Sequence, residues 1–139
     1  MPDNRSLNVG DTASLTRAFN DSDVRSFAEL SGDKNPVHLD AEFAATTQFG
    51  QRIVHGALVT SLFSTLLGME LPGEGSIYMS QNSQFRAPVH LDEEVTATVE
   101  VVEINDKKPI VTLKTTVTNA EGKAVVRGEA VMFVPWLKG

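Results

Sequence analysis

The sequence predicts a single α+β domain in which an antiparallel β-sheet wraps around one central, buried helix. In the second half of the chain, apolar and polar residues alternate with a period of two, which is typical of β-strands. One run, residues 57–69, is apolar on nearly every side and therefore favours a buried helix. With 139 residues, the chain has the length of one domain with its own core, and we treat residues 1–139 as that domain.

Two shorter helices are predicted before the buried one. The segment Asn20–Asp23 offers capping side chains ahead of apolar residues at helical spacing, and Gly32 is a suitable end for that helix. Asp40 can cap a second short helix that ends near residues 49–50. Between the two, proline disfavours the helical conformation of the residue before it, so we expect residues 33–38 to form a stiff, irregular loop.

The strands are separated by recognisable turns. Residues 105–109 and 119–122 carry the Asn, Asp, Gly and Pro that favour tight turns. Strands are predicted from residue 76 to residue 134, and residues 11–19 add a leading strand. An antiparallel sheet around a single buried helix is the hotdog arrangement. Its open sheet edges must be covered, and a second copy of the chain would cover them.

Composition excludes several classes of protein. The net charge of -6 argues against nucleic-acid binding, which needs a basic face. The chain contains no run of roughly 18 apolar residues that would span a membrane, and residues 1–5 lack the apolar core of a signal peptide. The absence of cysteine excludes disulfides, thiolate catalysis and cysteine-bound zinc. These features favour a cytoplasmic protein.

The histidines do not predict a metal site. His38, His55 and His90 lack the H-x-x-x-H spacing, and no carboxylate cluster lies beside them in the sequence. We therefore predict neither a metal nor another cofactor.

The segment Ser31–His38, with the sequence SGDKNPVH, indicates acid–base chemistry. It places Asp33 five residues before His38, and these are the two side-chain types most often used to move protons near neutral pH. Loops held by a rigid scaffold commonly carry such groups. An isolated pair of this kind is more often a helix cap and an ordinary histidine, so the interpretation depends on the rest of the chain.

Together, Ser31–His38 and the segment Ile53–Gly56 (IVHG) resemble the hydratase motif of the MaoC-like hotdog family. Further segments are similar to the (R)-specific enoyl-CoA hydratases of polyhydroxyalkanoate metabolism. These segments are residues 61–68, 71–78, 85–89, 92–95 and 128–130. The resemblance covers almost the whole chain in the same order.

This resemblance implies an enzyme of fatty acid metabolism. The implied reaction is the reversible syn-hydration of a short- to medium-chain trans-2-enoyl-CoA to an (R)-3-hydroxyacyl-CoA, carried out by a homodimer without a cofactor. It also implies that Asp33 and His38 are the catalytic pair. Gly56 is then the oxyanion donor at the start of the central helix, and Ser64 supports the site.

Other residues have weaker assignments. Asn35 is expected to brace the loop through side-chain hydrogen bonds. His55 and Arg86 are candidates for substrate binding, although His55 can instead serve only to support the start of the helix. Arg52 and Lys34, like Arg86, are candidates for contacts with the CoA phosphates. Ser64 has a purely structural alternative, because hydroxyls in buried helices often bond to the carbonyl four residues earlier.

The roles of the pair and the reaction itself leave alternatives open. In the simplest assignment Asp33 activates water and His38 protonates C2 of the substrate, but the roles can be reversed or both residues can act through one water. An acyl-CoA thioesterase of the same fold would direct that water at the carbonyl carbon instead. A dehydratase subunit acting on 3-hydroxyacyl groups of acyl carrier protein would need a basic patch at the mouth of its tunnel. A non-catalytic acyl-binding subunit would not need the pair at all.

Overall fold

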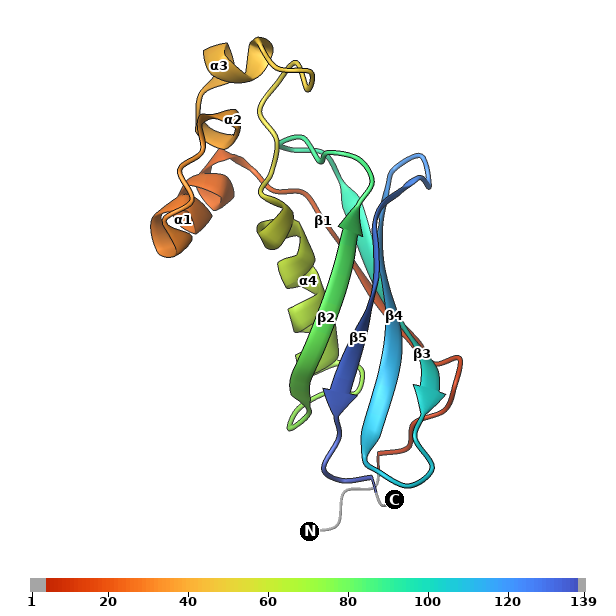
Figure 1. Ribbon diagram of the computed structural model, residues 1–139. Coiled ribbons are helices and arrows are strands. Elements are labelled where there is room, and N and C mark those ends of the chain that lie inside the picture. Colours follow the sequence, from red (N-terminus) through yellow and green to blue (C-terminus); the bar gives the residue numbers. More distant parts are fainter. Residues whose placement is uncertain (1–4, 138–139) are drawn as a thin grey trace.

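The computed structural model describes residues 5–137 and consists of one curved sheet with four helices. In chain order the elements are β1 (Thr12–Arg17), α1 (Asp21–Ser31), α2 (Pro36–Leu39), α3 (Ala41–Ala45), α4 (Gly56–Met69), β2 (Ile77–Phe85), β3 (Val95–Ile104), β4 (Ile110–Asn119) and β5 (Ala124–Phe133). Helix α4 lies along one face of the sheet, and α1, α2 and α3 gather at the end of the molecule where α4 begins (Figure 1).

The sheet is antiparallel with the strand order β1-β3-β4-β5-β2, so β1 and β2 form its two edges. The β3–β4 and β4–β5 pairs are hairpins whose turns lie where the sequence predicts them. The inward-facing side chains of β3 are buried, and those between them are partly exposed over most of the strand. The predicted α+β hotdog fold and its leading strand are therefore confirmed.

The core lies between α4 and the concave face of the sheet. Phe63, Leu66 and Leu67 of α4 are fully buried against the inward-facing residues of the strands. Burying each such side chain contributes about 1.5–3 kcal/mol, so this packing fixes α4 firmly on the sheet. Among residues 5–137, no helix is both long and apolar enough to cross a membrane.

One side of α4 is not buried within a single chain, so the expectation of a helix buried on every side is wrong. Ala57, Ser61, Ser64 and Thr65 are exposed. Hydroxyl side chains can lie on such a face because they bond locally. Ser61 Oγ, for example, donates to the Leu58 carbonyl. Apart from Met69, which is 63% exposed at the end of the helix, this side of α4 carries small or hydroxyl-bearing side chains.

The segment from Asp33 to His38 also departs from expectation in its second half. Asn35 is extended, as the following proline requires, but its side chain accepts a 3.2 Å hydrogen bond from the Val37 N–H and caps a one-turn helix. Pro36 is the first residue of α2, where its missing N–H costs nothing and its fixed φ suits a helix. His38 therefore lies on a short helix and not on an irregular loop.

The flanking helices follow the capping signals. Asn20 and Asp23 form a reciprocal capping box at the start of α1, and Gly32 ends that helix in the left-handed conformation with φ 82°. Asp40 caps α3 through the N–H groups of Glu42 and Phe43. That helix ends at Ala45, earlier than predicted, because Thr46 and Thr47 turn their hydroxyls back onto the carbonyls of Phe43 and Ala44.

We predict that Gly128→Ala strongly destabilises the protein. Gly128 of β5 faces β2 so closely that an added Cβ would lie 1.9 Å from the Asn82 carbonyl oxygen, which is backbone and cannot swing away. Overpacking of this kind costs about 1–3 kcal/mol or more of the free energy of unfolding. The control is Gly122→Ala, which meets no atom within 4 Å and carries only the strain of φ +79°. Urea denaturation that shows an equal or smaller loss for Gly128→Ala would contradict this packing.

Candidate active site

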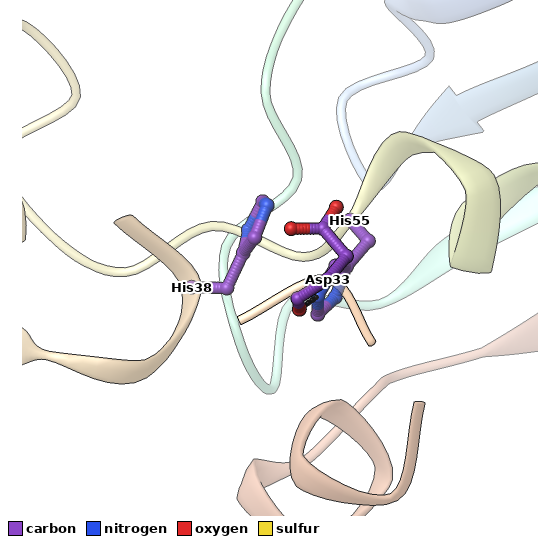
Figure 2. A group of neighbouring side chains, drawn as sticks. All are labelled: Asp33, His38 and His55. Carbon is purple, nitrogen blue, oxygen red and sulfur yellow. Dashed lines mark hydrogen bonds between the residues drawn. The ribbon is translucent and has the colours of Figure 1, made fainter. Parts of the chain in front are cut away.

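Three polar side chains from separate segments meet beside the start of α4 (Figure 2). Asp33 follows α1 after Gly32, His38 lies on α2, and His55 is the residue immediately before α4. A carboxylate oxygen of Asp33 and one ring nitrogen of each histidine lie within 4.8 Å of one another. The structure therefore brings together the two residues that the sequence proposes as the catalytic pair, and adds His55 to them.

His38 is held in one tautomer by a backbone carbonyl. Its Nδ1 lies 2.8 Å from the Ile53 oxygen, and because a carbonyl only accepts, Nδ1 carries the proton and Nε2 of the neutral ring has a free lone pair. Burial lowers the pKa of His38 below its ordinary value of 6.5, and the neighbouring His55 lowers it further. The Ile53 carbonyl and Asp33 act in the opposite direction without reversing the shift. His38 is therefore neutral at pH 7 and able to accept a proton.

His55 braces the other two residues. It is 1% exposed, and its Nε2 donates to the backbone oxygen of Asp33 over 2.9 Å. Its ring stacks on that of His38 with 3.8 Å between centroids, and Phe27 contacts it at 4.8 Å. Its Nδ1 is buried without a hydrogen-bond partner among residues 5–137. These contacts indicate that His55 supports Asp33 and His38, which is the structural role that the sequence left open for it.

Local hydrogen bonds shape the Asp33 segment. The Asp33 carboxylate accepts from the Asn35 N–H at 3.2 Å, and the Asp33 N–H donates to Ser31 Oγ at 3.2 Å. Asn35 in turn caps α2 through Val37, so it braces the segment as expected. Asp33 itself is exposed, which leaves its carboxylate accessible to water and to a substrate.

The same three residues make a poor metal chelate. The His38 and His55 rings are only 26° from parallel, so their lone pairs, which lie in the ring planes, run side by side instead of converging on one point. One nitrogen of each ring is already bonded to a carbonyl. The geometry thus favours hydrogen bonding to a shared small molecule, and we assign no metal to the cluster.

The start of α4 offers free N–H groups beside a cavity. Gly56 and Ala57 are the first two residues of the helix, and within residues 5–137 their N–H groups have no acceptor. A Cβ at Gly56 would lie 2.7 Å from Cε1 of Phe85, so only glycine fits without moving that ring. Both glycine and phenylalanine line a largely apolar cavity of about 680 Å³. Partial positive charge at a helix N-terminus favours a developing oxyanion there.

Ser64 and Arg86, two of the predicted site residues, lie apart from the pair, and Lys34 is engaged in an ion pair. Ser64 is on the exposed side of α4, more than two turns beyond Gly56. Arg86 is exposed at the rim of the cavity, where its guanidinium donates to Gln84 Oε1 at 3.1 Å. Lys34 pairs with Glu29 at 3.2 Å. Sequence reasoning missed the role of Ile53, because a backbone carbonyl has no side-chain signature.

We predict that His38 titrates below pH 6.5, because burial disfavours its charged form. The folded state then releases this proton more readily than the unfolded state. The neutral ring therefore contributes stability above about pH 6.5, and this contribution is lost as the pH falls through the lower folded pKa. Imidazole ¹H–¹⁵N correlation spectra across pH 4–8 measure the midpoint, with His38→Gln identifying the signal. A midpoint at or above 6.5 would show that the ring is not desolvated.

Comparisons with known proteins identify the family of this chain. Residues 6–123 match the model of the MaoC like domain. The chain is 51% identical over 131 residues to an (R)-specific enoyl-CoA hydratase of Aeromonas caviae, covering 94% of this chain and 98% of the relative. It is 46% identical over 129 residues to a protein of the same name from Rhodospirillum rubrum, covering 93% and 89%.

Solved structures of two hydratases have the same fold as this chain. The A. caviae (R)-hydratase involved in PHA biosynthesis superposes with a TM-score of 0.92 at 51% identity, covering 94% of this chain and 99% of that structure. The R-hydratase PhaJ1 of Pseudomonas aeruginosa superposes with a TM-score of 0.87 at 44% identity, covering 92% and 82%. Fold, site and comparisons together place this chain in the MaoC-like family of hotdog proteins.

Proposed function

We propose that the protein is a hydro-lyase that adds water reversibly and with syn geometry to trans-2-enoyl-CoA, giving (R)-3-hydroxyacyl-CoA. The observation that carries this proposal is the placement of Asp33 and neutral His38 within reach of one water, beside the free N–H groups of α4. The identity of about half the residues to proteins named (R)-specific enoyl-CoA hydratase supports the choice of substrate.

A single water fits between the two acceptors. A water that donates one hydrogen bond of about 2.8 Å to each of two acceptors holds them about 4.5 Å apart. An Asp33 carboxylate oxygen and a ring nitrogen of His38 lie within 4.8 Å of each other, an upper limit that leaves room for this span. Such a water directs its two protons at Asp33 and His38 and its lone pair outward, toward C3 of a bound enoyl thioester.

The proton balance of the reaction uses the same pair. The water oxygen forms the bond to C3 while one O–H bond breaks, and the released proton passes to Asp33 or to His38 Nε2. That group then delivers the proton to C2. Because Nδ1 holds the only proton of neutral His38, Nε2 must first receive a proton before it can donate one. Both additions come from the side of the substrate that faces the pair, which gives syn geometry. A proton-transfer group of this kind typically contributes about 10²–10⁴-fold to the rate.

The start of α4 completes the site. As C3 is attacked, negative charge develops on the thioester oxygen, and the N–H of Gly56 is the natural donor to it. A donor of this kind contributes about 3–4 kcal/mol to lowering the barrier in other enzymes. Phe85 leaves no room for a side chain at residue 56. Because Gly56 has none, the thioester oxygen can approach its N–H from the cavity that both residues line.

We also infer that the working unit is a homodimer in the cytoplasm that acts on short- to medium-chain substrates. Edge strand β2 exposes large apolar side chains, including Met79 at 53% and Phe85 at 58%. An unpaired edge with exposed apolar residues favours association. A second copy would cover β2 and the exposed side of α4, including Ser64, which would bring that serine into the enclosed region around the substrate.

We predict that Asp33→Asn and His38→Gln each lower kcat by about 10²–10⁴-fold, because each removes one proton acceptor. The assay follows loss of the enoyl-thioester absorbance of crotonyl-CoA and of a longer hexenoyl-CoA, with a thiol reagent present in parallel. The control is Asp106→Asn in the β3–β4 turn, an exposed position that should retain full activity. Thiol release from saturated acyl-CoA would identify a thioesterase. Full activity in both folded site variants would refute the assignment of the pair.

We predict that sedimentation equilibrium gives twice the 15.0 kDa mass of one chain. Met79→Lys places a charge on the exposed edge strand and should shift the protein toward the monomer. Val102→Lys is the matched control, since Val102 is 38% exposed on the outer face of β3, away from β2. A wild-type protein that sediments as a single chain at micromolar concentration would contradict the proposed dimer.

A further inference from the structure

We propose that Arg52 is a positioning residue that sets the separation between Asp33 and His38. Its Nε donates to the backbone oxygen of His38 at 2.6 Å, and its Nη1 lies 2.8 Å from Oδ1 of Asp21. One guanidinium thus joins the turn that carries the imidazole to the helix that leads to the carboxylate. Only the kinetic consequence of this proposal rests on the proposed function.

The contact with α2 matters because that helix is a single turn. The last carbonyls of a helix lack partners within the helix, and a basic side chain can supply the missing donor. Arg52 does so for His38, and the adjacent Ile53 bonds to the same turn twice, through its N–H to the Val37 carbonyl at 3.2 Å and through its carbonyl to His38 Nδ1. Residues 52–53 therefore fix both the backbone and the ring of His38.

The contact with Asp21 connects residues 52–53, which hold His38, to helix α1. Asp21 is the first residue of α1, and the chain reaches Asp33 directly after that helix ends at Gly32. The Arg52 side chain is only 16% exposed, whereas that of Asp21 is 54% exposed, so water competes for this ion pair mainly from the Asp21 side. Hydrogen bonding from Arg52, and secondly from Arg25, holds the pKa of Asp21 below its usual value. The Asp21 carboxylate is therefore ionised near neutral pH, where it can pair with Arg52.

This placement replaces one expectation from the sequence. Arg52 was a candidate for contacting CoA phosphates, but its guanidinium points into the protein and two of its nitrogens are engaged there. The third, Nη2, is buried as well. Lysine would keep the charge, but all its donors lie on one nitrogen. It therefore cannot bind the His38 oxygen and the Asp21 carboxylate in the planar geometry of the guanidinium.

The kinetic test compares four variants with crotonyl-CoA. Arg52→Gln should lower kcat by about 10–100-fold while KM stays within about twofold, because a misplacement of about 1 Å costs on this scale and CoA is not contacted. Arg52→Lys should recover part of this loss, and Asp21→Asn should show a smaller loss of kcat. Arg25→Gln is the control, since Arg25 binds the same Asp21 carboxylate but is 56% exposed, and among residues 5–137 its guanidinium makes no hydrogen bond to α2.

A second measurement needs no turnover. Imidazole ¹H–¹⁵N spectra report whether His38 keeps its Nδ1–H tautomer, and the chain has only three histidines to assign. Arg52→Gln should shift the His38 signals toward an exchanging mixture of tautomers, while Arg25→Gln leaves them unchanged. If Arg52→Gln does not fold, Arg52→Lys and Asp21→Asn provide the same comparison.

The two readouts separate the possible failures. A folded Arg52→Gln variant with wild-type kcat and wild-type His38 signals would overturn the positioning role. If the wild-type protein does not hydrate enoyl-CoA, the proposed function fails, and the imidazole spectra still decide whether Arg52 positions His38.

Discussion

The site depends on the 2.8 Å hydrogen bond between Nδ1 of His38 and the backbone oxygen of Ile53. This bond selects the tautomer, orients the ring and leaves Nε2 as the free acceptor. Burial acts in the same sense by keeping the ring uncharged near neutral pH. Without the bond, the ring could turn and a water shared with Asp33 would lose one of its two acceptors. A histidine whose other nitrogen is held by backbone is a reliable proton carrier, because its orientation does not change as the proton moves.

The fold makes this bond possible by fixing the segment before α4. Helix α4 is locked onto the sheet by side chains such as Phe63 and Leu66, so the residues leading into it have little freedom. The Ile53 carbonyl, the His55 ring and the Gly56 N–H come from four consecutive residues and serve three purposes. The start of this buried helix thereby fixes the imidazole of His38, the backbone of Asp33 and the proposed oxyanion donor relative to one another.

Much of this could be predicted from the sequence, for identifiable reasons. Period-two alternation and the cap formed by Asn20 are local patterns that the chain obeys directly. The short helix α2 was missed because Asn-Pro excludes a helix before the proline and yet favours one after it. The exposed side of α4 was missed because hydroxyls such as Ser61 satisfy themselves locally and look compatible with burial. The contacts of Ile53 and Arg52 involve backbone atoms of a distant turn, which no residue pattern encodes.

The most direct test of the central claim is the geometry of addition. Hydration of crotonyl-CoA in D₂O places deuterium on C2 and oxygen on C3, and proton NMR of the product distinguishes the two diastereomers. If Asp33 and His38 share one water on one face of the substrate, a single diastereomer forms in which both groups entered from the same side. The reverse reaction does not change the diastereomer, because syn elimination removes the same deuterium that syn addition placed on C2. A product with the groups on opposite faces, or a mixture, would contradict a shared water and with it the account of the site.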